Sequence, residues 1–298
     1  MQLNKPFIVA CIPAKDEEKA IAKVIIKTMR HVDKVIVCDD GSKDMTGEIA
    51  GRLGAEVIRH ERNLGYGAAL ASLFEKAREV KADIMITIDG DGQHNSDDIP
   101  SLIEPIISGE ADVTIGSRFI NRSEDQTPSY RKTGIKIITK MTNMLTHNEI
   151  TDAQSGFRAY SRKAIEHIKP SEMGMGASTE ILMNTNGNGL RIKEVPIKII
   201  YGKGSSTHNP LSHGIGIVLS TVKHLSIRRP LLFYGVPGFI LLIIALFFWV
   251  WTLQIFAVTR QIMTNITLIA IGATIVGLML LTTAIILWVL VSVLRERQ

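Results

Sequence analysis

Short apolar runs alternate with longer amphipathic segments along the first half of the chain. The apolar runs predict strands at Phe7–Ile12, Lys34–Cys38, Glu56–His60, Ile84–Ile88 and Val113–Ile115. Between them, apolar residues at helical spacing predict helices at Glu17–Met29, Asp44–Leu53, Tyr66–Glu79 and Asp97–Ile107. Repeated strand–helix units with apolar strands are typical of an α/β fold, with a mostly parallel sheet and helices on both faces.

The next part of the chain is less regular. Helical spacing predicts helices at Arg131–Leu145, Ser161–Ile168 and Thr179–Gly187, followed by an extended segment at Leu190–Tyr201. The stretch Thr151–Arg158 (TDAQSGFR) is polar and contains glycine, so we expect a loop there. Leu211–Leu225 has a helical apolar pattern that fits either a helix along a membrane surface or one packed on the soluble domain.

Two stretches near the C-terminus carry no charged residue. Leu231–Ile255 and Ile266–Leu294 are each long enough to cross a hydrocarbon core of about 30 Å at about 1.5 Å per residue. They predict a two-helix transmembrane hairpin within residues 230–298, with spans at about 231–255 and 266–294. A juxtamembrane amphipathic helix at 211–229 and a soluble domain at 1–210 would precede it.

Basic residues flank this hairpin on one side. Arg228 and Arg229 precede it, Arg295 and Arg297 follow it, and the connection between the spans carries only Arg260. The positive-inside rule therefore predicts an integral membrane protein with its soluble domain on the cytoplasmic face. The chain opens without a signal-like segment, which leads to the same expectation.

Small residues on the second span leave the oligomeric state open. Gly272, Ala273 and Gly277 allow close helix contact, so a homo-oligomer could form through the hairpin, although lipid-facing glycines would give the same pattern.

Charge and cysteine content narrow the class of partner. The formal net charge is only +5, and the sequence has neither interleaved aromatic and basic residues nor zinc-type Cys/His spacing. We therefore expect no nucleic-acid partner. Cys11 and Cys38 lie in predicted strands, where reduced, buried thiols are expected in a cytoplasmic domain.

Polar and charged residues collect where the predicted strands end. These ends are Pro13–Glu17, Asp39–Ser42, Asp89–Asp91 and Gly116–Arg118. In open α/β sheets, ligands bind beyond the carboxyl ends of the strands. Four such clusters in succession predict a nucleotide site at this edge.

Asp89 and Asp91, separated by one glycine, suit a hard divalent cation. Like charges this close repel each other, and Mg²⁺ typically takes one or two carboxylates and completes its shell with water and phosphate oxygens. The amide oxygen of Gln93 could support that shell, whereas we expect His94 to cap or pack. The same spacing would also suit calcium or a plain turn.

The glycines of Asn63–Ala69 resemble a dinucleotide fingerprint but depart from it. Leu70 occupies the third glycine position, and the segment follows the third predicted strand and not the first. Gly65 and Gly67 can bring a helix N-terminus close to an anionic ligand, or they can form a tight turn.

Six motifs occur in order along the chain. They are Pro13-x-x-x-Glu17, Asp39-Asp40-Gly41-Ser42-x-Asp44-x-Thr46, Asn63-x-Gly65-x-Gly67, Asp89-x-Asp91-x-Gln93-His94, Gly116-Ser117-Arg118-Phe119 and Asp152-x-x-Ser155-Gly156-Phe157-Arg158. Together they resemble family 2 glycosyltransferases of the Rossmann-like GT-A fold, and more closely the dolichyl-phosphate mannose or glucose synthases. The resemblance covers about residues 6–210 and extends to the plan of a C-terminal membrane hairpin.

The resemblance implies roles for individual residues. Pro13, Glu17 and Asp39, with Asp40 and Gly65, would bind a GDP- or UDP-sugar. Asp89, Asp91 and Gln93 would hold Mg²⁺ or Mn²⁺ on its diphosphate, and Lys203 would close over that diphosphate. Arg118 and Arg131 would contact phosphate, which suits guanidinium geometry. Many relatives have an aromatic residue where this chain has Lys15, and the Gln-x-x-Arg-Trp motif of processive synthases is absent.

The implied reaction is transfer of a hexose to a polyprenyl or dolichyl phosphate with inversion at the anomeric carbon. Such an acceptor is already anionic, so alignment and charge neutralisation would dominate catalysis, through the metal that Asp91 would help to hold and through Arg118, Arg131 and Lys203. Asp152 would act as a base or, in our preferred interpretation, anchor the Ser155–Arg158 loop. GDP-mannose and UDP-glucose donors, another glycan or lipid acceptor, and a non-catalytic sugar-nucleotide-binding scaffold remain alternatives.

Overall fold

The computed structural model describes residues 5–120, 135–136, 139–140, 142–143, 149–199, 226 and 230–296, with side chains as far as residue 291. The chain divides into two compact units, Met1–Ser220 and Thr221–Gln298. Most of the predicted helix at Arg131–Leu145 lies outside the described residues, as do Arg131, Lys203 and the predicted helix at Leu211–Leu225. The proposed domain boundaries at 210 and 229 therefore stay predictions.

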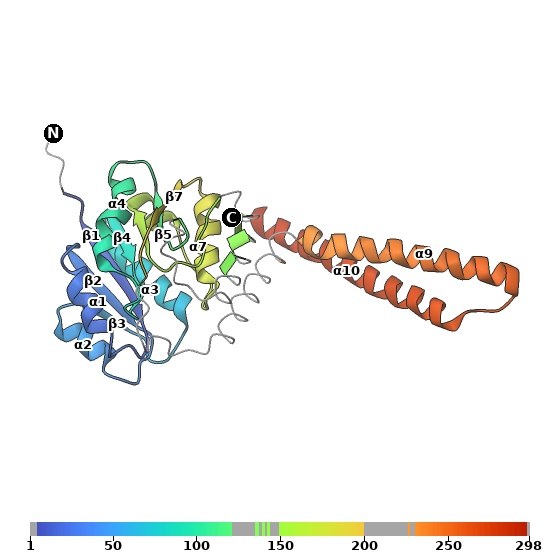
Figure 1. The fold of residues 1–298 in the computed structure, drawn as a ribbon, viewed down its shortest axis with the longest axis horizontal. Coiled ribbons are helices and arrows are strands. Elements are labelled where there is room, and N and C mark those ends of the chain that lie inside the picture. The colour runs from blue at the N-terminus through green and yellow to red at the C-terminus, as the bar shows by residue number, and fades with distance from the viewer. Residues whose placement is uncertain are drawn as a thin grey trace. The chain divides into compact units, whose positions relative to one another are not determined.

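The described part of the N-terminal unit contains a seven-stranded sheet (Figure 1). Its strands are β1 (Ile8–Ala14), β2 (Lys34–Asp39), β3 (Glu56–Arg59), β4 (Ile84–Thr87), β5 (Val113–Ser117), β6 (Arg158–Ser161) and β7 (Ile192–Pro196). They follow the spatial order β3-β2-β1-β4-β6-β5-β7, and only β6 runs antiparallel to its neighbours. The prediction of a mostly parallel sheet is confirmed.

Helices cover both faces of this sheet and bury two apolar cores. Their bounds are α1 (Ile21–Thr28), α2 (Thr46–Arg52), α3 (Tyr66–Glu79), α4 (Ile99–Ile107, after a 3₁₀ turn at Ser96–Asp98), α6 (Arg162–His167) and α7 (Ala177–Gly187). One core lies under α3, α6 and α7 and includes Leu73, Phe74 and Tyr160. The other lies under α1, α2 and α4 and includes Ile21, Ile25 and Leu102.

Strand pairing fixes the edge at which ligands would bind. Ala14 at the end of β1 pairs with Asp39 at the end of β2, and Cys11 pairs with Thr87 at the end of β4. Because these strands are parallel, the polar residues that follow them emerge side by side.

The strand β6 was not predicted. The Thr151–Arg158 loop ends one residue early, and Arg158–Ser161 inserts between β4 and β5. This segment has no apolar run, since Arg158 occupies its first position, and hydrophobic patterning alone could not identify it.

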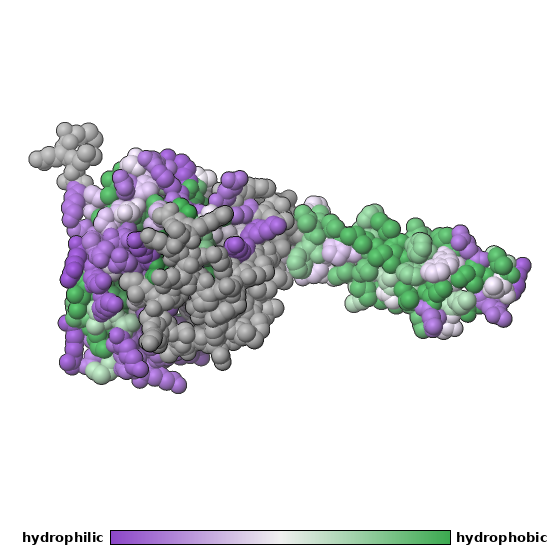
Figure 2. Space-filling model, viewed as in Figure 1, coloured by the Kyte–Doolittle hydropathy of each residue, from purple (hydrophilic) through white to green (hydrophobic). Residues whose placement is uncertain are grey.

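The C-terminal unit is a helical hairpin. A π-helical turn at Leu231–Gly235 leads into α9 (Val236–Thr259), and α10 (Thr264–Glu296) returns. Large apolar side chains cover its surface (Figure 2). Only 11% of either span is buried, whereas a core helix of a soluble protein would be mostly buried. Both helices are long and apolar enough to cross a membrane, which suits them to anchor the chain.

Small residues bring the two helices of the hairpin together. Buried positions recur every seven residues on each helix: Gly238, Ala245 and Thr252 on α9, and Ala270, Gly277 and Ala284 on α10. A Cβ atom on Gly238 would lie 3.0 Å from the carbonyl oxygen of Gly277. Gly277 therefore serves contact within the chain, whereas a Cβ on Gly272 would have no atom of the described residues within 4 Å.

Candidate active site

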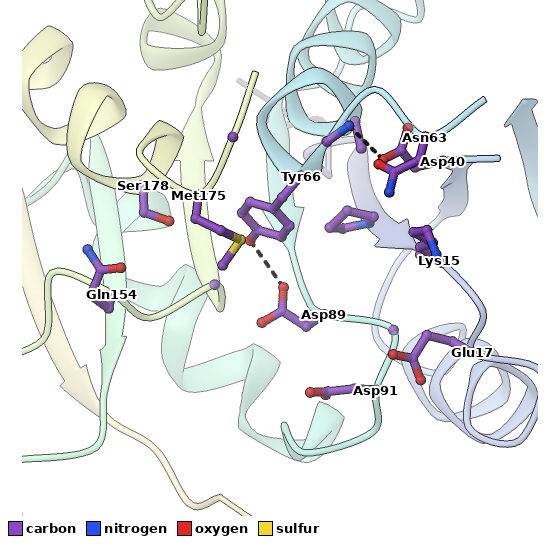
Figure 3. Close-up of a pocket in the computed structure, with 17 residues that line it drawn as sticks. Lys15, Glu17, Asp40, Asn63, Tyr66, Asp89, Asp91, Gln154, Met175 and Ser178 are labelled. Carbon is purple, nitrogen blue, oxygen red and sulfur yellow. Dashed lines mark hydrogen bonds between the residues drawn. The ribbon is translucent and has the colours of Figure 1, made fainter. Parts of the chain in front are cut away.

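A cavity of about 450 Å³ opens at the edge of the sheet where β1, β2 and β4 end (Figure 3). Its lining includes Pro13, Lys15, Glu17, Asp40, Asn63, Gly65, Tyr66, Asp89, Asp91, Gln154, Gly156, Met175 and Ser178. The structure thus brings together six of the predicted donor and metal residues: Pro13, Glu17, Asp40, Gly65, Asp89 and Asp91. Asp39, Gln93, Arg118 and Asp152 do not belong to the lining.

Two neighbouring side chains contact the carboxylate of Asp89. The hydroxyl of Tyr66 donates to its Oδ1 at 3.1 Å, and Nε2 of His94 lies 3.4 Å from its Oδ2. Burial by itself would raise the pKa of Asp89, but the contacts with His94 and Tyr66 and the charge of Arg118 outweigh burial and lower it. Asp89 is therefore ionised at neutral pH.

Negative charge accumulates on the opposite wall of the cavity. Burial, followed by repulsion from Asp91, Asp44 and Asp89, raises the pKa of Glu17 to about 7. The backbone amide of Gln93 donates to Oδ1 of Asp91 at 3.0 Å, which fixes the turn that carries this second carboxylate. Carboxylates from the ends of β1 and β4 therefore face one another at this wall.

This donor set fits a hard divalent cation. No three His, Cys, Asp or Glu side chains converge as a metal cluster among the described residues. Asp89 and Asp91 would instead supply one or two carboxylate oxygens, and phosphate oxygens of a substrate would complete the shell, as is usual for Mg²⁺. Repulsion at Glu17 is what a nearby cation would relieve. The amide ligand role of Gln93 stays a prediction.

Asp39 lies behind the cavity and is fully buried. Its Oδ1 accepts a hydrogen bond of 2.9 Å from the amide of Ser42, and so turns the chain between β2 and α2. Its Oδ2 has no hydrogen-bond partner among the described residues, with Nε of Arg59 at 3.5 Å. The predicted contact between Asp39 and a nucleoside stays a prediction.

Asp40 and the glycines shape the wall formed by the start of α3. Asp40 accepts hydrogen bonds from the amides of Leu64 at 2.8 Å and Gly65 at 2.9 Å. Gly65 has a φ of +105°, and a Cβ there would lie 2.4 Å from the carbonyl oxygen of Met173. The amide of Gly67 donates to that oxygen at 2.9 Å. The glycines thus admit a backbone segment of the protein itself to the N-terminus of α3.

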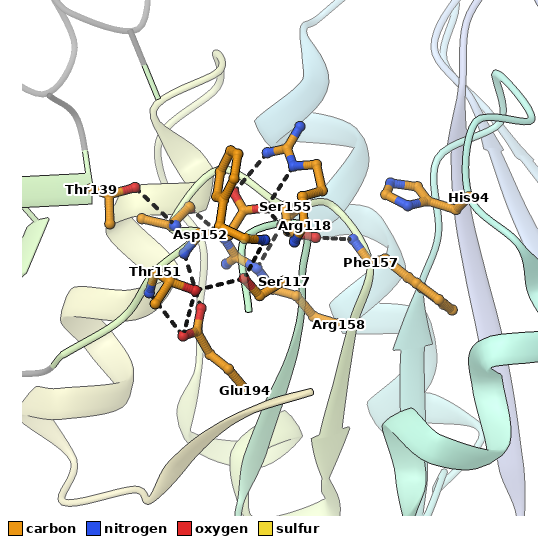
Figure 4. A network of polar contacts seen from close by, with 12 residues as sticks. His94, Ser117, Arg118, Thr139, Thr151, Asp152, Ser155, Phe157, Arg158 and Glu194 are labelled. Carbon is orange, nitrogen blue, oxygen red and sulfur yellow. Dashed lines mark hydrogen bonds and ion pairs between the residues drawn. The ribbon is translucent and has the colours of Figure 1, made fainter. Parts of the chain in front are cut away.

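Arg118 and Asp152 form a buried ion pair beside the cavity (Figure 4). Nε and Nη2 of Arg118 donate to the two carboxylate oxygens at 2.6 and 2.7 Å, and Asp152 is fully buried. Glu194 accepts from the amides of Thr151 and Asp152 at 2.8 and 2.9 Å. This geometry favours the interpretation of Asp152 as an anchor, because both of its oxygens are engaged by Arg118.

Arg158 supports the loop that carries Gln154 and Gly156. Its guanidinium is buried and donates to the carbonyl oxygens of Ser155, Ala153 and Ser178 at 2.8, 2.8 and 3.1 Å. Arg158 belongs to one of the motifs found in the sequence, but its role in tying this loop to α7 was not predicted.

Five cavity residues were not identified as site residues from the sequence: Tyr66, Gln154, Gly174, Met175 and Ser178. Gln154 lies in the polar TDAQSGFR stretch and Tyr66 directly follows Gly65, so the motifs came within one residue of both. Met175, which stands between two glycines in the sequence, and the nearby Ser178 belong to none of the motifs.

Residues 9–169, more than half of the chain, match the family model described as Glycosyl transferase family 2. The chain belongs to glycosyl transferase family 2. This family 2 enzyme carries every cavity residue up to Gly156 within the matched segment, and Met175 and Ser178 beyond it.

Two archaeal relatives are similar over most of their length. The enzyme is 37% identical to a UDP-N-acetylglucosamine–dolichyl-phosphate N-acetylglucosaminyltransferase of Methanococcus voltae, over 65% of this chain and 86% of that protein. It is 32% identical to a dolichyl-phosphate hexose transferase of Haloferax volcanii, over 70% of this chain and 89% of that protein.

A solved structure confirms the predicted GT-A type of α/β fold. Glucosyl-3-phosphoglycerate synthase from Mycobacterium tuberculosis, in complex with Mn²⁺, UDP-glucose and phosphoglyceric acid, matches with a TM-score of 0.55. The match covers 73% of this chain and 79% of that one at 22% identity, so the likeness is one of fold.

Proposed function

We propose that this family 2 glycosyltransferase transfers a sugar from a nucleotide-diphosphate donor to a polyprenyl phosphate. One combination of features carries the proposal. A cavity with paired carboxylates at Asp89 and Asp91 and a hairpin apolar enough for a membrane belong to the same chain. The names of the two archaeal relatives, both of which act on dolichyl phosphate, support this acceptor.

The donor is proposed as a UDP-linked hexose or N-acetylhexosamine, with GDP-mannose as the alternative. The relative that is 37% identical uses UDP-N-acetylglucosamine by its name. Dolichol-phosphate mannosyltransferase of Pyrococcus furiosus, which is 32% identical over 58% of this chain, keeps a mannosyl donor in consideration.

Asp89 and Asp91, with the amide oxygen of Gln93, would hold Mg²⁺ or Mn²⁺ against the donor diphosphate. When bound, this ion would neutralise the charge that the nucleoside diphosphate gains as it leaves. Tyr66 and His94 keep Asp89 ionised and oriented for that task. Pro13, Glu17, Asp40 and Gly65 line the cavity in which the donor would bind. The nucleoside contact expected of Asp39 would require access to a side chain that is fully buried in this structure.

The acceptor phosphate needs no strong base, because it is already anionic at neutral pH. One of its oxygens attacks the anomeric carbon, a new C–O bond forms, and the bond from that carbon to the diphosphate breaks with inversion. Arg118 and Arg131 would offset the acceptor charge, and Lys203 would cover the diphosphate. Asp152 keeps Arg118 in place and takes no proton in this scheme.

The hairpin would keep the enzyme at the leaflet that displays the lipid phosphate. The basic residues that flank it in sequence support a cytoplasmic active site. Such an arrangement is consistent with nucleotide-sugar donors, which the catalytic domain would draw from the cytoplasm.

Radiolabel transfer into an organic-extractable lipid tests the proposal. Full-length enzyme in detergent would receive polyprenyl phosphate and labelled UDP-glucose, UDP-N-acetylglucosamine or GDP-mannose, with Mn²⁺, with Mg²⁺ or with EDTA. We expect metal-dependent labelling from one donor, and its loss by about a hundredfold or more in Asp91→Asn. The exposed Asp97→Asn is the matched control. Donor binding without labelled lipid would point to another acceptor or to a scaffold.

A further inference from the structure

We propose that His60 is a positioning residue of the donor cavity, acting through Asp40 on the backbone at Leu64 and Gly65. The inference rests on the proposed function, because the cavity it concerns is the one assigned there to the nucleotide sugar. His60 follows β3 directly, and its side chain is only 10% exposed.

A continuous set of hydrogen bonds links His60 to the cavity wall. Nδ1 of His60 lies 2.7 Å from Oδ1 of Asp40, which itself lines the cavity. The same carboxylate accepts the amides of Leu64 and Gly65 at 2.8 and 2.9 Å. His60 thus supplies the third donor to the group that fixes this turn.

The partners of His60 engage both of its ring nitrogens. The carboxylate of Asp40 can only accept, so Nδ1 donates to it. Nε2 forms a hydrogen bond of 3.0 Å with the hydroxyl of Ser72, and the thiol of Cys38 lies farther away at 3.6 Å. The ring is therefore held from both sides between β2 and α3.

This arrangement has the hydrogen-bond order of a Ser-His-Asp triad, but it does not have the surroundings of one. Ser72 lies in the interior of α3 and belongs to none of the cavity linings described above. Besides His60, the carboxylate of Asp40 accepts hydrogen bonds from two backbone amides. The group therefore orders a turn and is not a nucleophile.

The position of the Asn63–Gly65 turn matters because both of its ends line the cavity proposed for the donor. Asn63 and Gly65 line the cavity, and the next residue, Tyr66, donates to Asp89. Gly41 packs beneath the same turn, where a Cβ would lie 2.5 Å from the carbonyl carbon of Arg62. Releasing Asp40 would let Leu64 and Gly65 move and would misplace Tyr66 relative to the metal carboxylate.

Three substitutions test this role. In His60→Asn, the side-chain amide keeps a donor at the place of Nδ1, whereas His60→Gln shifts it to the place of Nε2. Ser72→Ala removes only the outer partner. Binding of UDP and of GDP with Mn²⁺ would be measured by calorimetry on the full-length chain in detergent, together with KM and kcat for the donor that supports transfer.

We expect His60→Gln to weaken nucleotide binding and raise the donor KM by about tenfold, the loss typical of a hydrogen bond to a charged group. His60→Asn and Ser72→Ala should stay within about threefold of the wild type. Hydrogen exchange at the amides of Leu64 and Gly65 should accelerate in His60→Gln and stay at the wild-type rate in His60→Asn. Equal binding and exchange in wild type and His60→Gln would overturn the role of His60 and leave the proposed function intact. A wild type that binds neither nucleotide would overturn the proposed function itself.

Discussion

Gly156 packs its backbone against the carboxylate of Asp89, so that a Cβ at residue 156 would lie 2.4 Å from Oδ2 of Asp89. The carbonyl oxygen of Gly156 accepts a hydrogen bond of 2.8 Å from the hydroxyl of Thr87 on β4. The hydrogen bond from Thr87 ties the loop after Asp152 to the end of β4, so a side chain on residue 156 would clash with the carboxylate of Asp89.

Gly156→Ala should lower transfer activity by about a hundredfold, because displacement of a metal carboxylate by about 1 Å is costly in this way. The apparent affinity for Mn²⁺ should fall as well. The measurement is a transfer assay titrated with Mn²⁺. Gly187→Ala is the control, since a Cβ at the end of α7 would meet no atom of the described residues within 4 Å. Wild-type activity in Gly156→Ala would contradict this account of Asp89.

Arg118→Ala should destabilise the catalytic domain by about 3–5 kcal/mol, because it leaves the buried carboxylate of Asp152 without its partner. The measurement is the thermal midpoint of the purified enzyme. A second substitution, Asp152→Asn, should restore much of the loss in the double variant, since it removes the stranded charge. If Arg118→Ala unfolds at the wild-type temperature, the ion pair contributes little to stability, and this prediction is wrong.

Glu17 predicts a pH dependence that metal should suppress. Its pKa rises from 4.5 to about 7 on folding, so the folded chain binds this proton more tightly than the unfolded chain. The stability that Glu17 contributes is therefore present below about pH 4.5 and is lost as pH rises through about 7. The test is the thermal midpoint of metal-free enzyme between pH 5 and 8, compared with Glu17→Gln.

In Glu17→Gln, the fall in stability across that range should be smaller. Mn²⁺ should flatten it in the wild type, because a cation beside Asp91 relieves the repulsion. A pH profile unaffected by both Mn²⁺ and Glu17→Gln would show that Glu17 does not sense the proposed metal site.

Gly277→Leu should loosen the hairpin, since a Cβ on Gly277 would already lie 2.9 Å from Cδ2 of Leu242. Overpacking of this kind costs about 1–3 kcal/mol. We expect a lower thermal midpoint in detergent, and an unchanged one for Gly272→Leu on the same helix, where a Cβ would have no neighbour within 4 Å in the part of the chain that the structure describes. Equal effects of the two substitutions would mean that the helices do not pack through Gly277.

Much of the fold could be predicted because the apolar runs and the helical spacing of the local sequence match the strands and helices of the structure. The strand β1 is an unbroken apolar run, β2 and β4 each carry an apolar run of at least three residues, and α3 begins at Tyr66 and ends at Glu79 as predicted. Since parallel strands end at one edge, the meeting of Pro13, Asp40 and Asp89 was also predictable.

The remaining features depend on contacts between distant segments. Arg158 can be buried in β6 because its guanidinium donates hydrogen bonds to the carbonyl oxygens of Ala153, Ser155 and Ser178. The carbonyl of Met173 occupies the N-terminus of α3, which motif spacing had left open to an anion. Neither arrangement has a local periodicity, so no pattern in the sequence could indicate it.

The most direct test of the central claim is the mass of the lipid formed by full-length enzyme from polyprenyl phosphate and its preferred nucleotide sugar in the presence of Mn²⁺. Direct attack of the lipid phosphate on the anomeric carbon predicts a product one sugar residue heavier than the acceptor, with a single phosphate and release of the nucleoside diphosphate. A lipid diphosphate product with release of the nucleoside monophosphate, or a sugar attached to an acceptor other than lipid phosphate, would contradict the account.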